Sequence, residues 1–148
     1  MVVSAMTLLV KGASARVLDA RPMRTISSPA APKPVAAYSQ AVEANGFLFT
    51  AGQLGIDPAA GALPAGIDAQ AEQVFANLRA ILDAAGSRPD QVVKVSIFLA
   101  DLSHFTSVNA VYERFVGAHR PARTTIGAAA LPQGALIEVD LVALAPKT

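Results

Sequence analysis

Apolar residues recur with a helical period over residues 71–85. They are Ala71, Val74, Phe75, Leu78, Ile81, Leu82 and Ala85. Because residues three and four positions apart lie on one side of a helix, the segment predicts an amphipathic helix with one apolar stripe. Asp68 precedes the stripe and is expected to cap the helix, and Gly86 follows it and is expected to end it.

A second segment with the same period follows further along the chain. Its inward positions are Phe105, Val108, Tyr112 and Phe115. We expect Asp101 or Ser103 to start this helix and Gly117 to end it. The sequence thus predicts two amphipathic helices, each with one apolar face to bury.

Five other segments have the pattern of β-strands. They are residues 35–43, 47–56, 92–99, 123–130 and 136–144. The first two flank Asn45-Gly46, a strong hairpin signal because both residue types accept left-handed backbone angles. The order ββαβαββ predicts an α+β layered domain with both helices on one face of a sheet.

The last predicted strand alternates between two faces. One face carries Ile137, Val139, Leu141 and Ala143, and the other carries Leu136, Glu138, Asp140 and Val142. Since successive side chains of a strand point to opposite sides, we expect the first set beneath the helices and the second on the helix-free face. A hairpin through the turn at residues 131–134 is expected to bring Arg123 to that same face. A half-apolar sheet face without helices needs a partner.

Arg123 and Glu138 are the strongest candidates for chemistry, because each is a charged residue in a strand with mainly apolar residues around it. The guanidinium of arginine is a planar fork that matches a carboxylate and gains strength where water is scarce. A carboxylate beside it can orient water and move a proton. The alternatives are a surface ion pair for Arg123 and, for Glu138, a strand charge that discourages aggregation.

Composition narrows the classes of protein. The chain is 53% hydrophobic and 16% charged over 148 residues, which favours one domain that buries a surface against copies of itself. An alternative is that small alanines inflate the count. The chain has no cysteine, and His104 and His119 lack metal-ligand spacing, so we expect no metal site.

Charge is distributed unevenly along the chain. Residues 1–22 carry three basic residues against one acid, a charge of +2, which leaves −1 of the net +1 for the rest. A folded region without a basic footprint predicts no nucleic-acid partner.

The first 22 residues match no element of the predicted fold. Met23 is a plausible true start, so we assign residues 1–22 to an N-terminal extension and residues 23–148 to a single domain. The extension is expected to be disordered or an over-extended start, and an organellar transit peptide is the alternative. Its apolar run is too short to span a bilayer, so we expect no membrane association and a cytoplasmic location.

Several separated motifs occur together in one order. They are Tyr38-Ser39-Gln40, the Asn45-Gly46 turn, residues 50–58, residues 108–115, Pro121-Ala122-Arg123, Leu131-Pro132 and residues 137–140. With these motifs the chain resembles, from about Ile26 to its end, the Rid family of reactive intermediate enamine/imine deaminases. Several motifs in register are far more specific than any one of them.

The resemblance implies a fold, an assembly and a set of site residues. The implied fold is chorismate-mutase-like, and the implied assembly is a homotrimer with a central barrel and a cleft at each subunit interface. By resemblance Tyr38 lines the cleft, Asn109 matches the asparagine of the second helix, and Gly52 and Gln53 match the tight Gly-Gln of the second strand. Asn109 and Gln53 are expected to be structural or supporting residues.

Two positions depart from the common family pattern. Ala51 stands where many members have a serine, and Thr125 where many have a cysteine. The first change removes a polar contact from the cleft and puts the substrate range or rate in doubt. The second matters less, because that position contributes chiefly backbone polar groups near the bound acid.

The resemblance implies hydrolysis of 2-enamine and 2-imine acids, such as 2-aminoacrylate and 2-iminopropanoate, to 2-keto acids and ammonia. In this hypothesis Arg123 grips the substrate carboxylate and Glu138 acts as the acid/base, without cofactor or metal. The alternatives are a non-catalytic trimer that binds small 2-keto acids, a related deaminase acting on 2-aminomuconate, and an endoribonuclease, which the charge disfavours.

Overall fold

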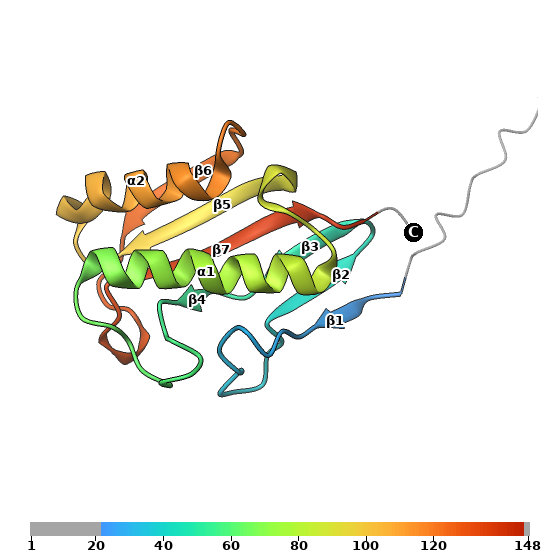
Figure 1. Ribbon diagram of the computed structural model, residues 1–148, viewed down its shortest axis with the longest axis horizontal. Helices are drawn as coiled ribbons and strands as arrows, with labels where there is room; N and C mark the ends of the chain where they lie inside the picture. The colour runs from blue at the N-terminus through green and yellow to red at the C-terminus, as the bar shows by residue number, and fades with distance from the viewer. Residues whose placement is uncertain (1–21, 147–148) are drawn as a thin grey trace, which may run out of the picture.

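The computed structural model describes residues 22–146, which form one seven-stranded sheet covered on a single face by two helices (Figure 1). The helices are α1 (Ile67–Ala85) and α2 (Phe105–Val116). The strands are β1 (Arg24–Ile26), β2 (Ala41–Ala44), β3 (Phe47–Thr50), β4 (Gln53–Leu54), β5 (Val92–Leu99), β6 (Ala122–Gly127) and β7 (Ile137–Leu144). The predicted α+β layered class is confirmed. The expectations for the N-terminal extension fall almost wholly outside the described residues.

The sheet order is β1-β2-β3-β7-β5-β6, with β4 paired to β7 beyond β3. All pairs are antiparallel except β5 and β6, which run parallel and are connected by α2. A crossover helix of this kind is the usual way to join parallel neighbours. The predicted hairpin of the last two strands is therefore wrong, because β5 lies between β6 and β7.

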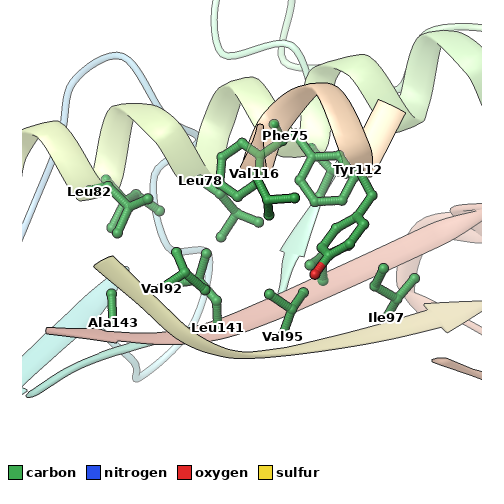
Figure 2. Packing of buried hydrophobic residues seen from close by; sticks show 14 of the residues in the cluster. Phe75, Leu78, Leu82, Val92, Val95, Ile97, Tyr112, Val116, Leu141 and Ala143 are labelled. Atoms are coloured by element: carbon green, nitrogen blue, oxygen red, sulfur yellow. The ribbon is translucent and has the colours of Figure 1, made fainter. Parts of the chain in front are cut away.

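The core lies between the helices and one face of the sheet. In β7, Ile137, Val139, Leu141 and Ala143 are all no more than 1% exposed, which confirms the predicted inner face. Figure 2 shows Leu141 and Ala143 beneath Leu78 and Leu82 of α1, and Val95 of β5 beneath the ring of Tyr112. Alternation in the sheet and helical period above it thus meet at one apolar layer.

Helix boundaries follow the predicted signals in part. Gly86 ends α1 with a left-handed φ of 74°, and Asp101 caps the 3-10 turn Leu102–His104 that leads into α2. The prediction that Asp68 caps α1 is wrong, because Gly66 holds that position. Asp68 instead lies in the first turn, where a negative charge favours the helix dipole.

The first strands differ from their predicted bounds. The Asn45-Gly46 turn is confirmed, with φ of 49° and 83°, but the strand before it begins at Ala41 rather than at residue 35. Strand β1 was not predicted. It pairs with β2 from a stretch that is too short to show a period.

The predicted strand 47–56 is interrupted by a bulge between β3 and β4. Phe49 pairs with Val142 and Gln53 with Val139, so three residues of this strand face two of β7. The Thr50 hydroxyl fills the gap by accepting the Leu141 N–H at 3.0 Å. The bulge places Ala51 and Gly52 beside Glu138.

Candidate functional site

The candidate site residues fall into two separate hollows. The first, which we name the Glu138 cleft, has a volume of about 360 Å³. It is lined by Pro32, Lys33, Val35, Tyr38, Ala51, Gly52, Gln53, Leu54, Ile56, Pro132, Gln133 and Glu138. The second, the Arg123 pocket, has a volume of about 350 Å³ and is lined by Asn109, Tyr112, Glu113, Val116, Arg120, Pro121 and Arg123.

Glu138 projects from the helix-free face of β7, as the alternation predicts. Within residues 22–146 its carboxylate has no hydrogen-bond donor and no cationic partner. Burial raises the pKa of this carboxyl, and the charge of Asp140 on the same face raises it further. A raised pKa favours a group that both holds and releases a proton near neutral pH.

Gly52 makes the close approach of Glu138 possible. A Cβ added at Gly52 would stand 2.0 Å from Oε1 of Glu138, which is far inside van der Waals contact. Only glycine leaves room for the carboxylate at this point of the bulge. The position of the Glu138 carboxylate therefore depends on a glycine at position 52 as well as on the fold.

Arg123 lies on the opposite face from the one expected. It pairs with Val95, whose side chain is 0% exposed under the helices, so Arg123 points to the helix-covered side. Its Nη1 donates to Oδ1 of Asn109 at 2.6 Å, and its guanidinium lies over the rings of Tyr112 and Phe105 at 4.7 and 5.3 Å. Phe105, expected in the core, is 43% exposed because it covers this guanidinium at the edge.

A single chain does not bring Arg123 and Glu138 together. Through β5, Arg123 stands opposite Leu141, which is three residues from Glu138 along β7. Strand geometry then separates their Cα atoms by about 10 Å along the strands and about 10 Å across them. The two candidate residues therefore belong to two half-sites.

The other predicted site residues divide between these half-sites. Tyr38, Ala51 and Gly52 line the Glu138 cleft, and Asn109 lines the Arg123 pocket. Gln53 is buried and also reaches the Glu138 cleft. The hydroxyl of Thr125 is buried on the Arg123 side without a hydrogen-bond partner in the described part of the chain.

Tyr38 and Tyr112 lie in different environments. Tyr38 precedes β2 in a loop and is 48% exposed, so it is a wall of the cleft rather than a strand residue. Burial raises the pKa of the Tyr112 phenol, and the nearby charges of Arg123 and Arg120 oppose this rise. The Arg123 pocket thus contains two positive charges, those of Arg123 and Arg120.

Buried amides hold the walls of the Glu138 cleft. Gln40 accepts the Ser28 N–H at 2.6 Å and donates to the carbonyl of Pro32 at 2.8 Å, which fixes the loop carrying Lys33. Gln70 of α1 accepts the Leu136 N–H at 2.8 Å and so holds the loop before β7. Sequence reasoning gave Gln40 no role beyond its motif and missed Gln70, although an amide beside the apolar stripe of the helix was a signal.

Gln133 and Lys33 are further lining residues that sequence reasoning missed. Gln133 has a positive φ of 57°, so the turn before β7 places a residue with strained backbone at the cleft. Lys33 belongs to the irregular lead-in, where no pattern predicts a site.

Two further features bear on function. Among residues 22–146 no group of three or more histidine, cysteine, aspartate or glutamate residues is placed to hold a metal. Neither α1 nor α2, the two helices of the described chain, is long and apolar enough to cross a membrane.

The α+β fold and the two half-sites define a small-molecule binding domain, and comparison with known proteins places it in a family. The family model described as endoribonuclease L-PSP matches residues 28–145. The chain belongs to this family, which includes the Rid proteins predicted from the motifs.

Named relatives and a solved structure are similar over most of the chain. A RutC family protein of Aquifex aeolicus is 45% identical over 82% of this chain and 99% of its own. A Rattus norvegicus protein named 2-iminobutanoate/2-iminopropanoate deaminase is 40% identical over 82% of this chain and 89% of its own. The structure of RidA from a Psychrobacter species is 41% identical, covers 82% of this chain and 98% of its own, and has a TM-score of 0.80.

Proposed function

We propose that the protein is a deaminase that hydrolyses 2-enamine and 2-imine acids to 2-keto acids and ammonia. The observation that carries the proposal is the Glu138 carboxylate, which lies against Gly52 in a cleft with no partner among the described residues. A relative that is 40% identical and named for this activity supports the substrate class.

We further propose that the half-sites meet between copies of the chain in a homotrimer. Arg123 and Glu138 lie on opposite sides of the sheet, so one molecule cannot place both on the same small substrate. The helix-free face also exposes Phe47, Phe49, Ile126 and Leu144 by 40–47%. Covering this face with a second copy would bury apolar surface and bring one chain's Arg123 toward the next chain's Glu138.

On a 2-imine acid the proposed reaction needs no step beyond hydrolysis. Arg123 binds the substrate carboxylate with two parallel hydrogen bonds and fixes C2 over the cleft. A 2-enamine acid first becomes the imine by moving a proton from nitrogen to C3. Glu138 takes a proton from water as the water oxygen attacks C2 and delivers this proton to the nitrogen, which gives the amino alcohol. Glu138 then moves the remaining hydroxyl proton to the nitrogen, the C–N bond breaks, ammonia leaves and the 2-keto acid remains.

The test couples the purified protein to an amino-acid oxidase that generates 2-iminobutanoate in solution. We expect release of 2-oxobutanoate faster than in the oxidase reaction alone. Glu138→Gln should still bind 2-oxobutanoate while its turnover falls toward the uncatalysed rate, because the amide cannot take a proton. Arg123→Lys should instead weaken binding of the keto acid, because an ammonium keeps the charge but loses the fork.

Ala51 is a reason to test a second candidate function, binding of a keto acid without turnover, in the same assay. It lines the Glu138 cleft with a methyl group where a hydroxyl could contact a substrate or water. If the parent binds 2-oxobutanoate but never accelerates its formation from 2-iminobutanoate, the protein is a keto-acid-binding protein and not a deaminase.

A further inference from the structure

A neutral amide separates two opposite charges in the Arg123 pocket. Asn109 accepts from Arg123 Nη1 through Oδ1 at 2.6 Å and donates through Nδ2 to Oε1 of Glu113 at 2.9 Å. Asn109 and Glu113 are one turn apart on α2, so the helix itself fixes their spacing. The three side chains form a line from carboxylate to amide to guanidinium.

This line leaves the charge of Arg123 available. Within residues 22–146 the ion pairs involve Arg24, Arg88 and Arg114, and none involves Arg123. A carboxylate bound directly to Arg123 would occupy its fork and neutralise it. The Asn109 amide accepts one N–H of Arg123 and lies between Arg123 and the Glu113 carboxylate, so the other N–H donors of Arg123 stay free for a ligand.

Glu113 and Arg123 hold the Asn109 amide from its two ends. A carboxylate only accepts hydrogen bonds and a guanidinium only donates them, so Glu113 binds the NH₂ group while Arg123 binds the amide oxygen. Without Glu113 the amide is held by Arg123 alone and can tilt about its side-chain torsions, which moves its oxygen and the guanidinium with it. The guanidinium carbon of Arg123 lies over the rings of Tyr112 and Phe105, and such ring contacts carry no hydrogen bond that would fix the rotation of the guanidinium in its own plane.

We propose that Glu113 is a positioning residue of the carboxylate site, acting through Asn109 to aim the free N–H groups of Arg123. The inference rests on the proposed function, because it assigns Glu113 to the binding of the 2-imino acid carboxylate. Glu113 acts on Arg123 through Asn109 and takes no part in proton transfer.

The experiment compares Glu113→Ala and Glu113→Gln with the parent on 2-iminobutanoate generated in solution. Glu113→Ala should raise KM about three- to tenfold, the effect of one hydrogen bond, with kcat nearly unchanged. Glu113→Gln should restore KM, because its amide oxygen can accept from Asn109. Glu72→Ala is the matched control, since Glu72 is an exposed helical acid that pairs with Arg114 outside both half-sites. Its KM should equal that of the parent.

Two measurements that do not depend on turnover separate this inference from the proposed function. The Kd for 2-oxobutanoate should rise with KM in Glu113→Ala, and the NMR signal of Arg123 Nε–H should shift or broaden in that variant alone. A parent without turnover would remove the proposed function and leave these measurements to decide. An unchanged Arg123 signal and Kd in Glu113→Ala, or equal weakening by Glu113→Gln, would overturn the positioning role.

Discussion

Single side chains in this protein are constrained most tightly where Gly52 meets Glu138. The missing Cβ at position 52 is the space that the carboxylate occupies. The same carboxyl has a raised pKa because burial there weakens its hydration. Glycine and glutamate therefore act as a pair, although Gly52 lies in the bulge between β3 and β4 and Glu138 lies on β7.

Gly52→Ala should lower turnover strongly while changing stability little. The added methyl would stand 2.0 Å from Oε1, and the flexible end of Glu138 can move away more easily than the backbone can. We expect kcat to fall by about tenfold or more, since a displaced general base loses its geometry. Turnover and thermal melting of the variant measure the two effects.

Gly127→Ala is the control for this change. Its methyl would meet only the Leu102 side chain closely, at 3.3 Å, on the edge strand β6. Its turnover should stay close to that of the parent. A Gly52→Ala protein with full kcat would show that Glu138 does not need its present position.

Whole elements were predictable where the signal is local. Helix α1, the inner face of β7 and the Asn45-Gly46 turn follow from period and turn chemistry alone. The position of β6 in the sheet does not follow from local signals, because the sequence of a strand does not show which strand it pairs with. The helical crossover puts β6 beside β5 and turns Arg123 to the side opposite the one expected.

The candidate site was predictable in its residues but not in its geometry. The motifs select Arg123, Glu138, Tyr38 and Gly52, yet their spacing gives no information on which of them share a hollow. The supporting amides escaped prediction for a related reason. A buried amide is recognisable only when its carbonyl partners are placed, as for Asn77 of α1 beneath the Glu138 cleft.

Asn77→Leu should destabilise the fold through the β4 region. Asn77 is 0% exposed, and its Nδ2 donates to the carbonyls of Leu54 and Ile56 at 3.0 and 2.9 Å. Leucine has similar volume but removes this donor from both carbonyls and the acceptor from Gln73, a loss of about 2–4 kcal/mol in the free energy of unfolding. Urea denaturation at fixed protein concentration measures it.

A leucine at the exposed position Ala84 of the same helix provides the comparison. This variant adds the same side chain without removing a hydrogen bond and should unfold within about 0.5 kcal/mol of the parent. Equal stability of Asn77→Leu and the parent would mean that the amide does not hold the β4 segment.

At the scale of the whole molecule, one face of the sheet is covered by helices and the other carries exposed apolar side chains. Phe47 and Phe49 lie 6.4 Å apart between ring centres, on the face opposite the buried Leu48. Such a surface rarely stays in water on a protein of this size. It is the physical argument for association with another copy, and the trimer is the form of that association that we propose.

Light scattering at micromolar concentration should give three times the chain mass of 15.2 kDa. Phe49→Glu places a charge in the proposed interface and should shift the mass toward one chain. Turnover should disappear with the trimer, because each substrate would need residues of two copies. A monomeric parent, or a monomeric Phe49→Glu protein with full turnover, would remove the proposal that the half-sites meet between copies.

The place of β6 in the sheet has a kinetic consequence. Within residues 22–146 this strand pairs with β5 alone, while β7 is paired on both sides, so β6 can detach without opening the core. In a lone chain the guanidinium half of the site should therefore exchange its amide hydrogens with solvent faster than the carboxylate half. Contact with another copy along that edge would slow this exchange. The protection of the amide hydrogens of residues 122–127 against exchange would then measure the fraction of the protein that has assembled.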